Sequence, residues 1–263
     1  MEKTLCNWLL QESNELKCVI DMLKICPYEG DNTNCEFIHA MPYDKNMLMN
    51  ISEIYPAISG EGTSTGMVCV IVRLVGCNQR CLACDSKYSY EGGTQKTTQD
   101  VVDQVLGYNI PTVLFTGGEP LLDPIVANNF LRAMMELGIT VYVETNGTVD
   151  IRPAKMLAHI VMDVKCPSTG MSENMYYRNF SLIGYTDEIK FVVADRTDYE
   201  YAKKVIEEQE LLLKTPNIYI SPSWSDDRTF FQELSNWMIE DKSVAKLMLQ
   251  QHKCIWPAVK RGV

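Results

Sequence analysis

The chain has 263 residues, 46% of them hydrophobic and 22% charged, which suits a soluble globular protein with one large domain or two smaller ones. Its net charge of −10 argues against general binding of nucleic acid, and no apolar run approaches the roughly 18 residues of a membrane span. The N-terminus lacks the apolar core of a signal peptide. Ten cysteines without an export signal therefore favour the cytoplasm and metal-bound thiolates.

From about residue 53, short apolar runs alternate with amphipathic segments. The pattern predicts strands over 67–74, 112–118, 140–147, 159–165, 188–194 and 217–222. It predicts helices over 97–108, 124–138, 197–213, 226–242 and 243–253, with Thr97 or Thr98 as the first N-cap and Gly138 closing the second helix. Six strands alternating with helices favour an α/β fold with a parallel sheet, namely an open or partial (β/α)6 barrel.

Three polar motifs follow the first three predicted strands. A cysteine loop follows 67–74, "TGGEP" follows 112–118 and "ETNG" ends 140–147. Because chemistry collects at the C-terminal ends of the strands in such folds, we expect these motifs to meet at one edge of the sheet.

The cysteine loop contains three cysteines in a C-x3-C-x2-C spacing: Cys77, Cys81 and Cys84. Three thiolates on a short loop can hold three irons of a cubane [4Fe–4S] cluster and leave the fourth iron open to a small molecule. The alternatives are a zinc site completed by a distant residue and cysteines without a metal.

The cysteine loop and "TGGEP", in this order and placement, resemble the radical S-adenosylmethionine (SAM) superfamily. The resemblance implies that the open iron binds SAM, and that one electron from the cluster releases a 5′-deoxyadenosyl radical. It also implies that the segment after the second strand contacts the methionyl amino group of SAM, where glycines allow a close backbone approach. These residues are Thr116, Gly117, Gly118 and Glu119.

A more specific resemblance covers about residues 51–263. The stretch "EIYPAISGEGTSTGMVCVIVRLVGCNQRCLACDSKYS" is similar to the opening of the 7-carboxy-7-deazaguanine synthase family, and "FTGGEPLL", "VETNGT", "DVKCPSTG", "EIKFVV" and "QQHKCIWPAVKRGV" follow in the family's order. The resemblance implies a carbon–nitrogen lyase that converts 6-carboxy-5,6,7,8-tetrahydropterin into 7-carboxy-7-deazaguanine with loss of ammonia, for queuosine-type biosynthesis. It further implies Mg²⁺, a homodimer and a one-electron reductant such as flavodoxin or ferredoxin.

The resemblance also implies roles for single residues. Glu61 would accept hydrogen bonds from the amino and ring N–H groups of the pterin, Arg73 would pair with the substrate carboxylate, and His252 would contact the substrate. Ser86 takes the place of a magnesium-binding threonine. Five more residues at strand ends are expected to face SAM: Glu144, Thr145, Asn146, Lys165 and Ser168.

Three positions depart from the family pattern. Ser59 replaces a usual glutamine, which removes one expected pterin contact, and Ala83 replaces a frequent aromatic residue beside the last cysteine. Ser86 keeps the hydroxyl oxygen that Mg²⁺ needs but lacks the methyl group of threonine. Two other functions therefore stay open: another radical SAM enzyme, such as a glycyl-radical activase, and a non-catalytic iron–sulfur or zinc protein.

Residues 1–50 lie outside the pattern and are expected to form an extension to a catalytic domain over 51–263. Within the extension, a C-x7-C-x8-C-x3-H spacing resembles a CCCH zinc finger and would suit tetrahedral Zn²⁺. Its four residues are Cys18, Cys26, Cys35 and His39. The alternative is a small helical cap from Leu5 to Leu23, with Cys18 and Cys26 simply buried as apolar residues. If zinc binds, the extension would have a role in contacting RNA or a partner protein.

Overall fold

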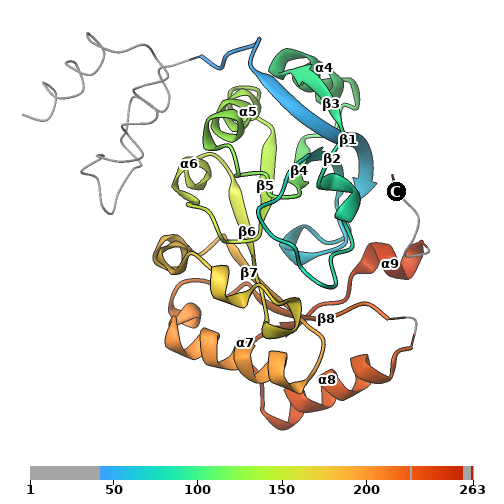
Figure 1. Ribbon diagram of the computed structural model, residues 1–263, viewed down its shortest axis with the longest axis vertical. Helices are drawn as coiled ribbons and strands as arrows, with labels where there is room; N and C mark the ends of the chain where they lie inside the picture. Colours follow the sequence, from blue (N-terminus) through green and yellow to red (C-terminus); the bar gives the residue numbers. More distant parts are fainter. Residues whose placement is uncertain (1–41, 226, 257–261, 263) are drawn as a thin grey trace, which may run out of the picture.

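A computed structural model describes residues 42–225, 227–256 and 262. Within them, nine strands form one sheet in the order β3-β1-β2-β4-β5-β6-β7-β8-β9, which stays open because β3 and β9 are its edges (Figure 1). The strands are β1 (Leu48–Ile58), β2 (Val68–Leu74), β3 (Thr94–Thr97), β4 (Thr112–Gly117), β5 (Thr140–Thr145), β6 (His159–Val164), β7 (Glu188–Val193), β8 (Ile218–Pro222) and β9 (Lys246–Leu247).

The six predicted strands are confirmed as β2 and β4 to β8, which lie side by side and run parallel. The partial (β/α)6 barrel is therefore the observed fold. The sequence did not predict β1 and β3, which pair antiparallel at one edge. A register shift between Ile51 and Glu53 interrupts β1, so its side chains do not alternate regularly.

The sheet begins before residue 51. Strand β1 starts at Leu48, and the backbone N–H of Asp44 donates to Asn129 Oδ1 of helix α5 (Pro124–Glu136) at 2.6 Å. The division of the chain into an extension and a catalytic domain remains a prediction. The four predicted zinc ligands of the extension lie outside the described residues.

Most of the predicted helices are present. Thr97 caps α4 in a capping box with Asp100, and Pro124 begins α5 as the residue type that best suits a first helical position. The α-helices are α4 (Thr98–Gly107), α5 (Pro124–Glu136), α6 (Arg152–Lys155), α7 (Arg196–Glu208), α8 (Thr229–Glu240) and α9 (Gln251–Ile255). The 3-10 helices are η2 (Gly62–Ser64), η3 (Lys87–Ser89), η4 (Pro167–Thr169), η5 (Ser172–Asn174), η6 (Tyr177–Leu182) and η7 (Leu211–Leu213). In the part of the chain that the structure describes, no helix combines the length and apolar character needed to cross a bilayer.

The prediction of one helix over 243–253 is wrong. Lys242 has a φ of 50°, which reverses the chain after α8, and the next residues form the edge strand β9 against β8. The apolar residues on either side of β9, Ala245 and Met248, are buried. They hold this strand in place and do not form one face of a helix. The shorter helix α9 begins only at Gln251.

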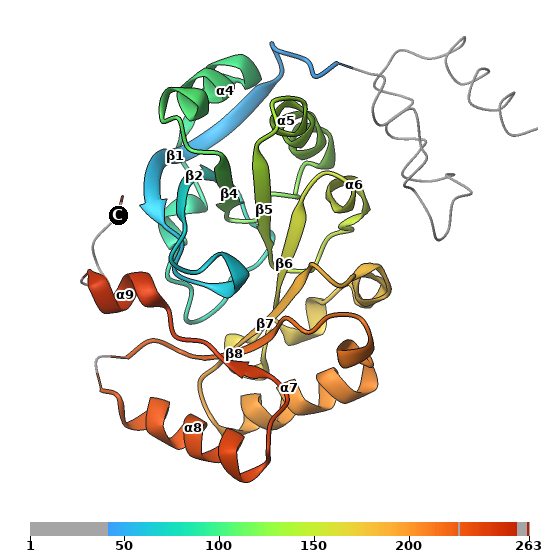
Figure 2. The same ribbon diagram turned by 180° about the vertical axis from the view of Figure 1, so that it is seen from behind.

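The two faces of the parallel sheet differ in character. One face carries the main apolar core, including Phe115, Val143 and Phe191, and helices α5 to α8 cover that face (Figures 1 and 2). The opposite, inner face carries polar side chains, because residues alternate between the faces of a strand. On β7, for example, Glu188 and Lys190 lie on the inner face. The strands that the sequence predicts as apolar thus present a charged inner surface.

Candidate active site

The cysteine loop leaves β2 at Leu74 and lies at the C-terminal edge of the sheet. Burial raises the pKa values of Cys77 and Cys81, and each is raised further by neighbouring thiols of the same set, so the three cysteines lie close together. All three are free and partly buried. Tyr90 follows the loop, and its pKa is raised first by burial and then by a hydrogen bond with Cys84. Three thiols on one short loop are residue types that suit a [4Fe–4S] cluster, but in the described residues their side chains are not arranged as a metal site.

The "TGGE" turn packs directly against the start of the cysteine loop. The N–H of Gly118 donates to the carbonyl of Leu74 at 3.2 Å, and the N–H of Glu119 donates to the carbonyl of Gly76 at 2.8 Å. A Cβ atom at Gly118 would lie 2.0 Å from the carbonyl oxygen of Gly76, so only glycine allows this contact. The two motifs therefore form one rigid surface.

Glu119 joins this turn to the loop after β5. Its buried carboxylate accepts hydrogen bonds from the N–H of Leu121 at 3.0 Å, from Thr145 Oγ1 at 2.9 Å and from the N–H of Asn146 at 2.7 Å. Burial nevertheless raises its pKa to about 6. Both carboxylate oxygens of Glu119 accept hydrogen bonds from the protein itself. Its backbone, rather than its carboxylate, is therefore placed to contact a ligand.

Asn146 completes the connection to the cysteine loop. Its amide nitrogen donates to Asn78 Oδ1 at 3.1 Å and lies 3.8 Å from Cys77 Sγ, while Asn78 also donates to Thr148 Oγ1 at 2.8 Å. The predicted SAM residues of β4 and β5 are thus brought together beside the first cysteine.

The loop after β6 contributes Lys165 and Ser168 in different ways. Lys165 Nζ lies 3.1 Å from Asp163 Oδ2, and its charge lowers the pKa of Cys81 against the larger effect of burial, which places the lysine beside the thiols. Ser168 instead donates from both its backbone N–H and its hydroxyl group to the buried Asp198 of α7. These bonds hold Ser168 against the first turn of α7.

Glu61 lies at the centre of a buried charged network. Its Oε2 accepts from Lys190 Nζ at 2.6 Å and its Oε1 accepts from Gln250 Nε2 at 2.7 Å. Burial opposes ionisation of Glu61, but these two donors outweigh burial and lower its pKa. The turn behind Glu61 is fixed by Glu188, which accepts from the N–H of Thr63 at 3.1 Å.

Two glycines make this arrangement possible. Gly62 has a φ of +67°, and a Cβ there would lie 1.9 Å from Glu188 Oε2. Gly60 lies beneath His252, since a Cβ there would lie 2.1 Å from His252 Nδ1. The N–H of Gln251 donates to the carbonyl of Gly60 at 3.0 Å, which docks α9 on the turn beyond β1 (Figure 2). Burial lowers the pKa of His252 and favours its neutral form.

Arg73 faces the same interior from β2. Its Nε donates to Glu53 Oε1 of β1 at 2.8 Å, and its guanidinium carbon lies 5.9 Å from the ring centroid of Tyr88. Tyr88 also donates to Glu53 at 2.9 Å. Glu53 and the ring of Tyr88 thus hold the guanidinium group in one orientation. Its remaining N–H groups therefore lie in a fixed plane.

Ser86 follows the last cysteine of the loop by two residues. Its hydroxyl donates to Asp85 Oδ1 at 3.0 Å, and Lys253 donates to the other carboxylate oxygen at 2.8 Å. Of the other departures, Ser59 is buried and its hydroxyl lies 2.7 Å from Ser64 Oγ, while Ala83 is exposed. Within the described residues, no group of three or more His, Cys, Asp or Glu side chains is arranged to hold a metal ion.

The sequence analysis assigned no role to five residues that complete the network, although all five lie within the stretches that resemble the family: Glu53, Asp163, Glu188, Lys190 and Gln250. A signal was present in "EIKFVV", where two charged residues two positions apart interrupt a strand that is otherwise apolar. In a buried strand, this spacing places both charges on one face.

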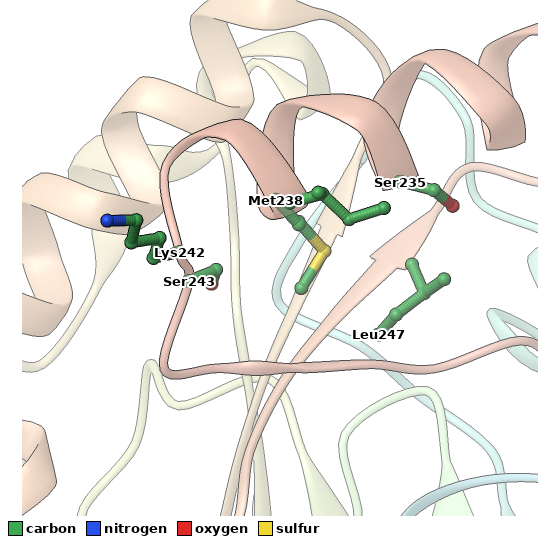
Figure 3. Close-up of a pocket in the computed structure, with 6 residues that line it drawn as sticks. Ser235, Met238, Lys242, Ser243 and Leu247 are labelled. Atoms are coloured by element: carbon green, nitrogen blue, oxygen red, sulfur yellow. The ribbon is translucent and has the colours of Figure 1, made fainter.

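Two cavities lie elsewhere, along α8 and β9. The larger has a volume of about 610 Å³, and the smaller, of about 380 Å³, is lined by Met238 and Leu247 among others (Figure 3). Neither is lined by a site residue that the sequence predicts. The candidate active site is therefore defined by its polar side chains at the strand ends.

Comparisons with known proteins agree with this site. The model of the radical SAM superfamily matches residues 71–169. The 7-carboxy-7-deazaguanine synthase of Koribacter versatilis is 35% identical over 82% of this chain and 100% of that protein. The enzyme of the same name from Chlorobaculum tepidum is 35% identical over 82% of this chain and 97% of that protein. The crystal structure of QueE from Escherichia coli shares the fold, with a TM-score of 0.63 at 21% identity, over 78% of this chain and 95% of that chain.

Proposed function

Because this chain belongs to the 7-carboxy-7-deazaguanine synthase family of the radical SAM superfamily, we propose that it converts 6-carboxy-5,6,7,8-tetrahydropterin into 7-carboxy-7-deazaguanine. The ring contracts with loss of ammonia, which makes the enzyme a carbon–nitrogen lyase. The observation that carries this proposal is the match at 35% identity over 100% of the relative's length. The matched part covers 82% of this chain and therefore reaches far beyond the superfamily motif at 71–169.

The cysteine loop fits the cofactors of the superfamily. Its three thiols are partly buried, and one of them, Cys81, lies near Lys165, whose positive charge favours the thiolate form. When bound, the cluster and SAM supply the single electron and the radical that start the reaction. The backbone of Gly117 and Gly118 and the amide of Asn146 border the same place and are the groups that would orient SAM.

The chain's own charged residues bind and orient the substrate. Glu61 is ionised and presents two carboxylate oxygens, each already accepting one hydrogen bond, to the paired N–H donors of the pterin. Arg73, held by Glu53, pairs with the substrate carboxylate. His252 covers the turn that carries Glu61, so α9 keeps water from this side of the site.

Ser86 and Asp85 support a magnesium site beside the substrate. Both side chains carry oxygen atoms, the ligand type that Mg²⁺ prefers, and Ser86 Oγ lies 3.0 Å from Asp85 Oδ1. In this proposal Mg²⁺ takes the place of the Lys253 ammonium on Asp85.

We also propose a cytoplasmic homodimer that receives electrons from a small carrier such as flavodoxin or ferredoxin. The free cysteines of the described residues support a reducing compartment, because thiolates must stay reduced to bind iron. Zinc binding by the extension remains a separate prediction. Metal analysis of protein purified without added zinc tests it, with one zinc per chain expected in the parent and none in Cys35→Ser.

Incubation of the reconstituted enzyme with dithionite, SAM and the carboxypterin tests the proposed function. We expect 7-carboxy-7-deazaguanine and one equivalent of ammonia, with SAM regenerated. Formation of 5′-deoxyadenosine alone, with or without the pterin, would indicate another radical SAM enzyme. Formation of neither product would indicate a binding protein.

A further inference from the structure

The two hydrogen bonds that Glu61 accepts from the protein resemble those that the proposed substrate would donate. Lys190 Nζ and Gln250 Nε2 reach the two carboxylate oxygens at 2.6 and 2.7 Å, one donor for each oxygen. The pterin offers the same pattern, an amino group and a ring N–H side by side. Glu61 can accept from the protein donors and the substrate donors together only if both sets fit around its carboxylate. Only 13% of its side chain is exposed, which leaves little room for a second set.

A second observation concerns where Lys190 can go. Asp163 lies opposite Lys190 in the register of β6 and β7, and its Oδ2 is 3.1 Å from Lys165 Nζ and 3.6 Å from Lys190 Nζ. The other oxygen, Oδ1, is buried and has no hydrogen-bond partner among the described residues. A buried carboxylate oxygen without a hydrogen-bond donor lowers the free energy of unfolding. Asp163 Oδ1 is therefore an acceptor that a nearby donor could satisfy.

Resting on the proposed function, we propose that Lys190 and Gln250 are substitute donors, which occupy Glu61 until the paired N–H groups of the substrate replace them, and that the displaced Lys190 then pairs with Asp163. Lys190 keeps an acidic partner in both states, since Glu61, Asp163 and Glu144 all face it. The exchange therefore avoids leaving a buried cation unpaired.

This exchange makes Lys190 a specificity-determining residue. A ligand that lacks one of the two donors cannot replace both protein donors, so the buried charges would stay paired with each other and the ligand would bind poorly. The 2-oxo analogue of the substrate, 6-carboxytetrahydrolumazine, has a carbonyl group in place of the amino donor. We expect the enzyme to bind this analogue roughly a hundredfold more weakly than the carboxypterin.

Equilibrium binding of both ligands to the SAM-loaded enzyme, without reductant, tests the inference. In Lys190→Met the stem of the side chain remains but the charge is lost, so the buried Glu61 takes up a proton and can donate to the lumazine carbonyl. We expect the ratio of the two dissociation constants to fall roughly tenfold, mainly through tighter lumazine binding. Lys204→Met, on the exposed side of α7, is the matched control and should keep the ratio.

Asp163→Asn supplies a second test that does not depend on the folding of Lys190→Met. Here the displaced lysine loses its carboxylate acceptor, so pterin binding should weaken while lumazine binding stays unchanged. A structural defect would weaken both ligands in parallel. Parallel weakening, or an unchanged ratio in both variants, overturns the inference and leaves the proposed function intact. Failure of the parent enzyme to bind the carboxypterin overturns the proposed function itself.

Discussion

The two halves of the active-site edge are built from different kinds of contact. On the half formed by β2, β4 and β5, backbone groups and short side chains join three turns, as in the bonds from Gly118 and Glu119 to the cysteine loop. On the half formed by β1, β7 and α9, long charged side chains meet, as Lys190 and Glu61 do at 2.6 Å. In the proposals above, the first half is a frame for a cofactor, and the second is a charge network whose partners are exchanged when the substrate binds.

If the two halves are separable, removing a thiolate should destroy one function and spare the other. We expect Cys81→Ser to lose the visible absorption of the cluster and all synthase activity after anaerobic reconstitution, because each thiolate holds a different iron. Binding of the carboxypterin, measured by equilibrium dialysis, should remain within a fewfold of the parent.

The control for this change is Cys254→Ser, which alters an exposed cysteine in the same way. It should keep its iron content. A full cluster in Cys81→Ser would remove the basis for assigning the loop.

The reciprocal change is Glu61→Gln. The amide can accept on one side only, and it leaves Lys190 buried without its closest acid, so kcat/KM should fall by roughly a hundredfold or more. Iron content and the slow cleavage of SAM without substrate should not change. A loss of iron in this variant would show that the two halves depend on each other.

The same difference explains what the sequence could predict. The thiolates and the "TGGE" turn are read from short motifs, because the residues that act together are neighbours along the chain. The parallel strands were predictable for a similar reason, since each is a compact apolar run. The antiparallel β1 was missed because its register shift disrupts alternation.

The charge network could not be read in this way. Lys190 and Glu61 are 129 residues apart, and Gln250 and Glu61 are 189 apart, so only the closed fold shows that they meet. The edge strand β9 was mistaken for a helix because its apolar residues are spaced as on a helix face, and the decisive feature is the φ of 50° at Lys242. The family resemblance placed Glu61 and His252 but did not indicate their partners.

Glu119 lies where the cofactor half is held together, so its replacement measures the stiffness of that half. In Glu119→Gln the amide N–H₂ must face one of the three donors that now bond to the carboxylate, which should cost about 1–3 kcal/mol of unfolding free energy. The affinity for SAM should fall with it, while pterin binding changes less. Urea unfolding and SAM titration measure the two effects.

The pH dependence gives Glu119 a second signature. Its native pKa of about 6 lies above the ordinary value of 4.5, so the folded chain holds a proton that the unfolded chain releases between these values. The contribution of Glu119 to the unfolding free energy should therefore be largest below pH 4.5, and it should fall by about 2 kcal/mol as pH rises through 6. Glu119→Gln should lack this fall.

The smallest expected effect is at Ser86, between the two halves. Ser86→Ala removes one candidate magnesium ligand but leaves Asp85, so activity should fall severalfold and depend less on added Mg²⁺, whereas Ser86→Thr should match the parent. An unchanged magnesium response in Ser86→Ala would exclude this serine as a ligand.

The bond between Gln250 and Glu61 also sets an order of events during synthesis. Its two partners are 189 residues apart, so at 5–20 residues per second Gln250 is added roughly 10–40 s after Glu61. The cysteine loop and the segments that contact it, which include Thr169 and Asn174, are complete once residue 174 has been made. If the proposed roles hold, a nascent chain has the thiols that would bind iron and sulfide before it has all the groups that would bind the pterin, and a chain that stalls between these points would bind metal without binding substrate.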